Sequence, residues 1–287
     1  MQNRLPVWFR QELADNSALE LQRELKANNI HTVCQEARCP NINHCFKQHT
    51  ATFLILGDRC TRDCAFCAVK KASGKLALDS NEPRRVANAV RQMGLGYVVI
   101  TSVTRDDLED GGARIFVDTI VQIRKASPKT RIELLIPDFK AEKETIKTIA
   151  DSRPLVLGHN LETVKRLYHL VRPQADYGRS LQVLKIIKEL DPAIIIKSAL
   201  MLGLGENKDE LGQAMLDLKM AGCDILVLGQ YLRPSVKHYP VKEFISPERF
   251  AQLAGLAKTI GFAKVLSGPK MRSSYQAFQV YQEISYA

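Results

Sequence analysis

The chain has 287 residues, of which 45% are hydrophobic and 25% are charged, and this composition excludes a largely disordered protein. No apolar run approaches the roughly 20 residues needed to cross a bilayer, and the amino end lacks the apolar core of a signal peptide. We therefore expect a cytoplasmic protein that binds no membrane. Lysine and arginine exceed aspartate and glutamate by 41 to 31, but no basic run carries interleaved aromatic residues, so we prefer a solvated basic surface to nucleic-acid binding.

Residues 1–51 are predicted to form an extension ahead of the main domain. The pattern of residues 16–27 indicates a helix, and the stretch after it is rich in cysteine, histidine and asparagine, with little apolar periodicity. This stretch is therefore predicted to contribute functional side chains rather than to pack in the hydrophobic core.

From residue 52 onward, short apolar runs alternate with longer segments of helical period. Strands are predicted at 52–57, 97–102, 131–136, 154–160, 193–201 and 224–229. Helices are predicted near 84–94, 111–126, 141–150, 161–170, 180–190, 207–221 and 247–260. Six strand and helix repeats in a row favour parallel strands with crossover helices, which fit either an open doubly wound sheet or a β/α barrel.

Polar residues at the predicted strand ends favour the barrel. They are Thr101-Ser102, Asn160, Lys197-Ser198 and Gln230-Tyr231. The carboxyl ends of barrel strands meet around one mouth, where functional residues collect. We predict an α/β fold, a partial (β/α)6 TIM-like barrel over residues 52–262, with N-terminal and C-terminal extensions covering the barrel mouth. In the C-terminal extension, 263–287, a loop through SGPKMRSSY and a short terminal helix are expected.

Six of the seven cysteines lie in two triplets, Cys34, Cys39 and Cys45, and Cys60, Cys64 and Cys67. Disulfides are disfavoured because the chain has no secretory segment and is large enough to fold without them. Structural zinc is a stronger alternative, but zinc takes four ligands, commonly in two C-x-x-C pairs. A triplet suits a 4Fe–4S cluster whose fourth iron binds something else.

Two other candidate ligands are left out of these sites. Cys223 precedes an apolar run and is predicted to be a small buried hydrophobic residue. His44 adjoins Cys45, and adjacent residues rarely face one metal together.

The second triplet follows an apolar strand and has an aromatic residue, Phe66, just before its last cysteine. This spacing and context resemble the signature of the radical S-adenosylmethionine (SAM) superfamily. The resemblance implies that Cys60, Cys64 and Cys67 hold a catalytic 4Fe–4S cluster whose open iron binds the methionyl part of SAM. Reductive cleavage of SAM would then give a deoxyadenosyl radical able to abstract hydrogen from an unactivated carbon.

The first triplet resembles the auxiliary-cluster motif of the lipoyl synthase family. The resemblance continues along nearly the whole chain, through ARCPN at 37–41, TSVTRDDLEDGGA at 101–113, HNLETV at 159–164, VRPQADYGRS at 171–180, KSALMLGLGE at 197–206, GQYLRPSVKHYPV at 229–241 and SGPKMRSSY at 267–275. It implies a sulfurtransferase that inserts two sulfur atoms at C6 and C8 of a protein-bound octanoyl group, with a second 4Fe–4S cluster consumed as the sulfur donor.

In this family the auxiliary cluster takes its fourth ligand from a serine of the RSSY motif, which here means Ser273 or Ser274. Spacing alone does not separate the two, and the resemblance favours Ser274 as a ligand and catalytic residue. The alternative is a loop serine that caps the terminal helix. A serine ligand implies that the carboxyl tail folds back toward residues 34–45.

Strand-end residues are the natural contacts for SAM. Polar groups suit the ribose hydroxyls and a cation suits the carboxylate, so the candidates are Thr101, Asn160, Lys197 and Ser198, with Arg179 for the carboxylate. Each of these residues could instead be a satisfied buried polar group.

The resemblance also implies partners. These are octanoylated lipoyl carrier domains (2-oxoacid dehydrogenase acyltransferase subunits and the glycine cleavage H protein), an electron donor such as ferredoxin or flavodoxin, and iron–sulfur cluster carrier proteins. The alternatives are another radical sulfur-inserting or methylthiolating enzyme acting on RNA, and a non-catalytic zinc protein that binds nucleic acid.

Overall fold

The apolar runs from residue 52 onward form one sheet in the computed structural model, which describes residues 5–9, 16–47, 50–72, 74 and 76–285. Its strand order is β1-β2-β5-β6-β7-β8-β9-β10, and every neighbouring pair is parallel except β1 with β2. The sheet does not close into a full barrel, because its two edge strands, β1 and β10, do not pair with each other in the described part of the chain. The partial α/β barrel is therefore confirmed.

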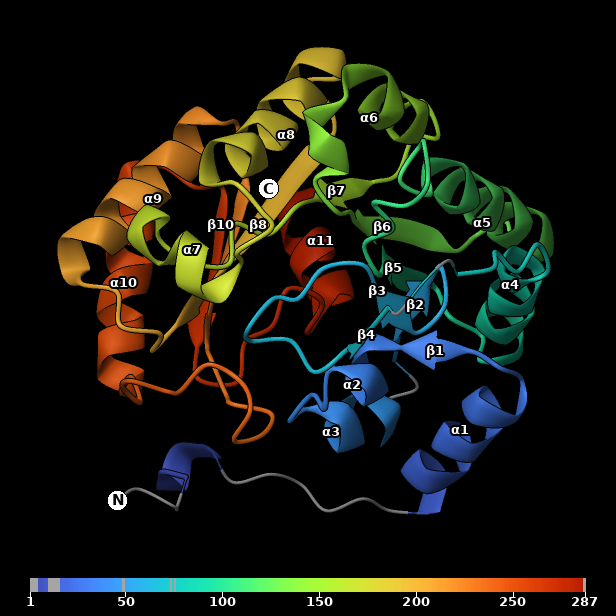
Figure 1. Cartoon of the computed structure of the whole chain (residues 1–287), viewed down its shortest axis with the longest axis horizontal. Coiled ribbons are helices and arrows are strands. Elements are labelled where there is room, and N and C mark those ends of the chain that lie inside the picture. The colour runs from blue at the N-terminus through green and yellow to red at the C-terminus, as the bar shows by residue number, and fades with distance from the viewer. Residues whose placement is uncertain (1–4, 10–15, 48–49, 73, 75, 286–287) are drawn as a thin grey trace.

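The strands and their covering helices alternate along the chain. The strands are β2 (Thr52–Ile55), β5 (Tyr97–Ser102), β6 (Arg131–Leu135), β7 (Val156–Gly158), β8 (Ile195–Leu202), β9 (Ile225–Gln230) and β10 (Lys264–Gly268). The helices are α4 (Glu82–Gln92), α5 (Ala113–Ala126), α6 (Lys143–Ala150), α8 (Tyr177–Leu190), α9 (Lys208–Met220) and α10 (Pro247–Ile260), which form the outer arc of Figure 1.

Shorter elements connect this arc to the mouth of the barrel. They are the strand pair β3 (Arg59–Cys60) and β4 (Lys70–Lys71), the 3-10 helices η2 (Phe139–Ala141) and η3 (Lys165–Leu167), and α7 (Tyr168–Val171). The N-terminal part comprises η1 (Val7–Phe9), α1 (Asn16–Ala27), β1 (His31–Thr32), α2 (Val33–Glu36) and α3 (Ile42–Lys47). The helix predicted at 16–27 is confirmed as α1. Among the described residues, no helix is long and apolar enough to cross a membrane.

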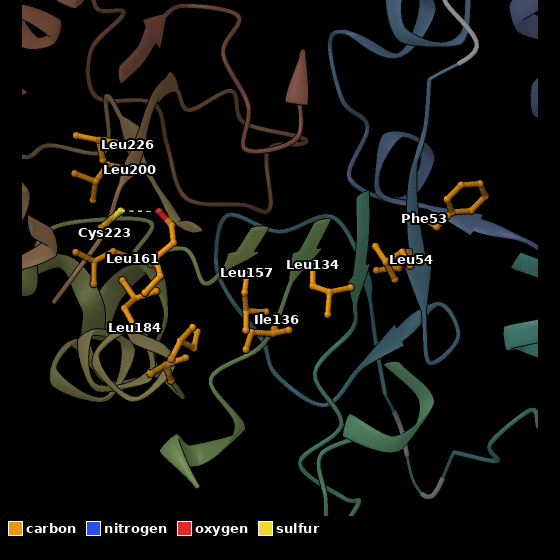
Figure 2. Packing of buried hydrophobic residues seen from close by; sticks show 14 of the residues in the cluster. Phe53, Leu54, Leu134, Ile136, Leu157, Leu161, Leu184, Leu200, Cys223 and Leu226 are labelled. Carbon is orange, nitrogen blue, oxygen red and sulfur yellow. Dashed lines mark hydrogen bonds between the residues drawn. The ribbon is translucent and has the colours of Figure 1, made fainter. Parts of the chain in front are cut away.

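The main hydrophobic core lies between the sheet and the outer helices. Strand residues alternate between the two faces of the sheet, and those facing the helices are apolar. Figure 2 shows this layer, to which Leu134, Leu157 and Leu226 contribute fully buried side chains. Each Å² of apolar surface buried here stabilises the fold by about 25 cal/mol. The same burial fixes the register of the strands, because a shift by one residue would turn the apolar side chains away from the helices.

Within the barrel, the structure adds one strand that was not predicted and shortens one predicted helix. The strand β10 was not predicted, because only a short run of apolar residues precedes Ser267 and Gly268. The helix predicted at 161–170 is wrong over its first half. There the backbone of Glu162 bonds to β8, accepting from Met201 N at 2.8 Å and donating to Ala199 O at 2.9 Å, so helical structure begins only at Lys165.

The terminal helix α11 (Ala277–Ser285), predicted from the sequence, lies inside the arc of the strands (Figure 1). Its Val280 packs against the lumen-facing residues Ala199, Ile225 and Val227. At the other side of the lumen, the Phe278 and Tyr281 rings lie 5.6 and 5.9 Å from the Tyr97 ring. Ile225 and Tyr97 begin their strands, so α11 fills the amino-end half of the lumen and leaves the carboxyl-end half open.

The loop before α11 is in close contact with the sheet at Gly229 of β9. A Cβ added to this glycine would overlap the backbone carbonyl of Met271. The absence of a side chain at Gly229 therefore lets the loop 269–276 lie against the sheet. Glycine within a strand often marks such a close approach of another backbone segment.

We expect Gly229→Ala to push this loop away from β9, because backbone cannot move aside as a flexible side chain does. Trypsin cleavage at Lys270 and Arg272, followed by mass spectrometry, should become faster than in the unaltered chain. The matched control is Gly255→Ala in α10, where an added methyl meets no atom within 4 Å and should stabilise the helix by about 1 kcal/mol. Equal cleavage rates for the two variants would contradict the prediction.

Candidate active site

A cavity of about 880 Å³ opens at the carboxyl ends of the strands. Three separate parts of the chain line it: the strand ends, the N-terminal part and the loop before α11. Among its lining residues are Cys34, Cys39, Thr52, Cys60, Arg62, Cys64, Cys67, Thr101, Asn160, Glu162, Arg172, Arg272, Ser273 and Ser274. Its volume is within the range of small-molecule sites.

The turn after β2 places the second cysteine triplet at this cavity. Leu56 and Gly57 adopt left-handed backbone, with φ of 69° and 82°. The buried Glu82 carboxylate accepts hydrogen bonds from both of their N–H groups, at 2.7 and 3.0 Å. These bonds satisfy donors that the turn would otherwise leave unpaired, and the chain then enters β3 and Cys60.

Backbone groups also surround the thiols of this triplet. The N–H groups of Thr104 and Arg62 donate to the Cys60 sulfur at 3.3 and 3.4 Å. Burial raises the pKa of the Cys67 thiol to about 11, and burial also raises that of Cys64, although the nearby Arg172 opposes the shift. Binding of iron must therefore displace protons from these thiols.

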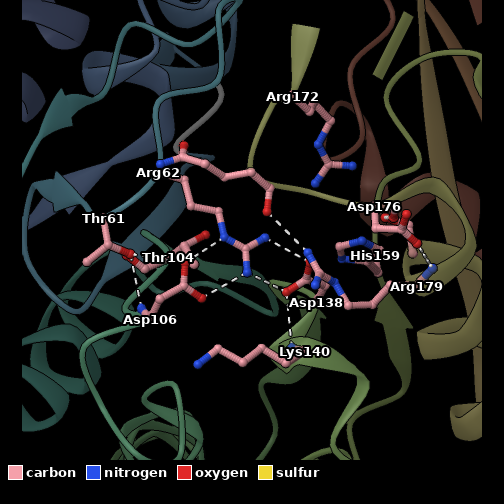
Figure 3. A network of polar contacts seen from close by, with 12 residues as sticks. Thr61, Arg62, Thr104, Asp106, Asp138, Lys140, His159, Arg172, Asp176 and Arg179 are labelled. Carbon is pink, nitrogen blue, oxygen red and sulfur yellow. Dashed lines mark hydrogen bonds and ion pairs between the residues drawn. The ribbon is translucent and has the colours of Figure 1, made fainter. Parts of the chain in front are cut away.

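Arg62, within the triplet, attaches its loop to two strand ends (Figure 3). The guanidinium donates to both oxygens of Asp106 at 2.7 and 2.8 Å, and to both oxygens of Asp138 at 2.7 and 2.8 Å. Arg62 is 5% exposed and Asp138 is fully buried. Arg179 adds a third contact, from Nε to Asp138 at 2.9 Å.

This pairing controls the charge of Asp138. Burial alone would raise the pKa of its carboxyl, but the hydrogen bonds and charge of Arg62 hold that pKa well below its usual range. The loop between Cys60 and Cys64 is thus fixed by two bidentate, charge-assisted contacts, which are the strong and directional kind.

The first cysteine triplet lies on two short helices and the loop between them. Cys34 is on α2, whose N-cap Thr32 accepts a hydrogen bond from Gln35 N at 3.3 Å, Cys45 is on α3, and Cys39 lies in the loop that joins them. Burial, with the effect of Cys39, raises the pKa of Cys34 to about 12 and that of Cys45 to about 11. Cys34 and Cys39 line the cavity, whereas Cys45 does not.

The two serines of the RSSY motif contact different parts of the cavity wall. Ser274 Oγ accepts a hydrogen bond from Thr52 Oγ1 at 2.7 Å, and Ser273 Oγ donates to Asn160 Oδ1 at 3.0 Å. The tail is also tied to the N-terminal part, since Asn41 Nδ2 donates to the Lys270 carbonyl at 2.7 Å. The tail therefore folds back over the barrel mouth.

No three His, Cys, Asp or Glu side chains converge tightly enough to hold a single metal ion within the described ranges. A 4Fe–4S cluster does not require such convergence, because each thiolate binds a different iron. The donor set fits two clusters in composition: three thiols in each triplet and a hydroxyl beside the first.

Two of the five candidate SAM contacts, Thr101 and Asn160, line the cavity. The Thr101 hydroxyl donates to the Leu135 carbonyl at 2.8 Å, and Asn160 Nδ2 donates to Glu162 Oε1 at 3.1 Å.

The structure does not bring the other three, Arg179, Lys197 and Ser198, to the cavity wall. Arg179 is engaged with Asp138 and the Gln174 carbonyl. Strand β8 continues to Leu202, so Lys197 and Ser198 lie within it rather than at its end. Lys197 pairs in the lumen with Glu133 at 2.8 Å, and Ser198 accepts from Leu161 N at 3.1 Å.

Sequence reasoning missed two residues that do line the cavity, Arg172 and Glu162. Arg172 is 8% exposed, and its buried Nε has no hydrogen-bond partner in the described structure. Glu162 holds a left-handed φ of 69°, a strained conformation that is typical of functional sites. Both lie in motifs already noted, VRPQADYGRS and HNLETV, but a motif does not reveal which way its side chains point.

The sequence model of the radical SAM superfamily matches residues 54–218. The chain is similar to the lipoyl synthase of Caldicellulosiruptor saccharolyticus, with 51% identity covering 96% of this chain and 97% of the relative. It is also similar to the lipoyl synthase of Geotalea daltonii, with 52% identity covering 96% and 92%.

Solved structures share the fold at low sequence identity. The hydrogenase maturase HydG from Carboxydothermus hydrogenoformans matches with a TM-score of 0.57 and 14% identity, covering 79% of this chain and 64% of that one. Coproporphyrinogen III oxidase from Escherichia coli, a radical SAM enzyme, matches with a TM-score of 0.51 and 13% identity, covering 73% and 50%.

Arg62→Met should destabilise the protein by about 3 kcal/mol in urea unfolding, because it leaves the buried Asp138 charge with Arg179 alone. The matched control is Arg249→Met, which breaks an exposed pair with Glu243 and should cost below about 1 kcal/mol. Equal losses in the two variants would contradict this role for Arg62.

The same variant should change the response to acid. A depressed carboxyl pKa contributes stability that is present above the unfolded value of about 3.9 and is lost as pH falls below it. In Arg62→Met the Asp138 pKa should rise, so the unfolding free energy should fall less steeply between about pH 5 and 3 than in the unaltered chain. An unchanged slope would argue against the pairing.

Cys223→Ser should leave the iron content unchanged. The Cys223 thiol is fully buried among core residues (Figure 2), contacts the Ile225 carbonyl at 3.2 Å and is not among the residues that line the cavity. Iron and sulfide assays of anaerobically purified protein test this, and loss of about half the iron would show that Cys223 is a ligand.

Proposed function

This chain belongs to the lipoyl synthase family of the radical SAM superfamily, and we propose that it inserts two sulfur atoms at C6 and C8 of a protein-bound octanoyl group. It is a sulfurtransferase of that superfamily. The observation that carries the proposal in detail is that one cavity is lined by the whole second triplet, by Cys34 and Cys39 of the first, and by the RSSY tail.

Two 4Fe–4S clusters are part of the proposal. Cys60, Cys64 and Cys67 would hold the one that cleaves SAM, and Cys34, Cys39, Cys45 and Ser274 would hold the auxiliary one. When bound, the first cluster would supply the electron that cleaves SAM to a deoxyadenosyl radical, and the auxiliary cluster would supply the sulfur. An alkoxide is a harder ligand than a thiolate, which suits an iron that must be released when the cluster gives up sulfur.

The choice of Ser274 over Ser273 is supported by their contacts. Ser274 accepts from Thr52, which begins β2, and β2 pairs with the strand β1 that leads into α2 and Cys34. Ser273 instead donates to Asn160, a candidate SAM contact. Adjacent serines therefore serve adjacent parts of the site.

Within the SAM site, Thr101 and Asn160 remain candidates, and Arg172 and Glu162 join them. The unpaired Nε of Arg172 suits a carboxylate, because a buried guanidinium group needs an acceptor. Arg172 also lines the cavity together with Cys64, a proposed ligand of the cluster that would bind the methionyl group. Arg179, Lys197 and Ser198 are better explained as structural contacts.

The partners proposed for this chain come from its family. Octanoylated carrier domains would present their lysine arm to the barrel mouth, and a small electron carrier and cluster carrier proteins would reduce and reload the enzyme. A cytoplasmic location is part of the same proposal.

An anaerobic reaction with a reductant, SAM and an octanoylated peptide, followed by mass spectrometry, tests the function. The expected product carries two added sulfur atoms. Cys34→Ala should still form deoxyadenosine without adding sulfur, whereas Cys60→Ala should do neither. If the unaltered chain forms deoxyadenosine but adds no sulfur, its radical SAM chemistry is supported and the octanoyl group is excluded as its substrate.

Ser274→Ala should destabilise the auxiliary cluster and abolish sulfur insertion, because it removes the proposed fourth ligand. Ser273→Ala is the matched control and should retain about eight iron atoms per chain. Iron content, measured after anaerobic gel filtration, distinguishes the two. Loss of iron in Ser273→Ala alone would reverse the assignment.

A further inference from the structure

We propose that Thr52 is a positioning residue that holds Ser274 beside the auxiliary-cluster cysteines. The inference rests on the proposed function, since it takes Ser274 as a ligand. It adds a residue outside all of the cysteine and serine motifs.

Thr52 joins the loop before α11 to the strand beside the first cysteine triplet. Its hydroxyl donates to Ser274 Oγ at 2.7 Å, across 222 residues of sequence. Thr52, Ser274, Cys34 and Cys39 all line the same cavity. The bond from Thr52 thereby holds Ser274 on the cavity wall that carries two of the proposed cysteine ligands.

The backbone of Thr52 is itself held by the sheet. It begins β2, which pairs with β5 in a register that places Thr52 opposite Val99. On its other side β2 pairs with β1, which leads directly into α2 and Cys34. Thr52 is 5% exposed and lines the cavity, so its hydroxyl is fixed in a place where water competes little.

The hydrogen bond of Thr52 differs from those of three other buried threonines. Thr32 donates to the side chain of Gln35 at 3.0 Å, only three residues along the chain. Thr119 and Thr101 donate to backbone carbonyls, at 2.7 and 2.8 Å, which satisfies their own hydroxyls and nothing more. Thr52 donates to a side-chain oxygen in the loop that returns over the barrel mouth. Such a bond becomes stronger when its acceptor carries negative charge, as an iron-bound serine oxygen does.

The test uses the full chain with Cys60, Cys64 and Cys67 changed to alanine, so that only the auxiliary cluster can assemble. Thr52→Val removes the hydroxyl and keeps the shape of the side chain. Thr52→Ser keeps a hydroxyl. Thr119→Val is the matched control, because it makes the same exchange at a fully buried site in α5.

The measurement is the anaerobic rate of iron release to a chelator, followed by absorbance, with paramagnetic resonance to detect clusters that have lost one iron. We expect Thr52→Val to release iron about tenfold faster than Thr119→Val, the order of effect of one hydrogen bond to a charged group. Thr52→Ser should stay within about twofold of the parent. Adding Thr52→Val to Ser274→Ala should have no further effect, because Thr52 acts through Ser274.

Equal rates for Thr52→Val and Thr119→Val would overturn the proposal, as would a Thr52→Ser variant as fast as Thr52→Val. An additive double variant would show a merely structural role. Thr52→Ala provides a second hydroxyl-free variant if valine prevents folding. If Ser274→Ala also leaves the rate unchanged, the serine ligand of the proposed function fails. A fast Ser274→Ala with a slow Thr52→Val rejects the role of Thr52 alone.

Discussion

The site depends on the buried contact of Arg62 with Asp106 and Asp138. The cysteine loop that carries Arg62 has little regular structure of its own, and its position comes from this guanidinium joined to two strand-end loops. Because both carboxylates are bound through two oxygens each, the contact fixes orientation as well as distance. The loop is thereby held against the same strand ends that line the cavity.

The open barrel explains how the two ends of the chain meet. A closed barrel would fill its lumen with its own side chains, whereas here α11 fills the amino-end half and leaves space above it. Gly229 lets the loop before α11 approach β9, and Asn41 and Thr52 form hydrogen bonds to the same loop from the other side. Residues between positions 33 and 40, together with residues 271–274, thus line one cavity with the strand ends.

Sequence pattern predicted the elements whose signal is local. The apolar runs at 97–102 and 131–136 became strands because parallel strands are buried on both faces. The pattern failed at 161–164, where bonds to β8 replace a helix, and at 264–268, where pairing with β9 makes a strand from a weakly apolar segment. In both places the deciding hydrogen bonds come from residues far along the chain.

The sequence by itself determined the cysteine triplets, the parallel α/β fold and the family, because spacing and hydrophobic period are properties of the chain alone. Only the tertiary structure decided which polar residues face the cavity. Lys197 and Ser198 are adjacent and point to opposite faces of β8, and neither reaches the cavity, while Arg172 does. It also separated Ser273 from Ser274, since the direction of each hydroxyl depends on partners more than 100 residues away.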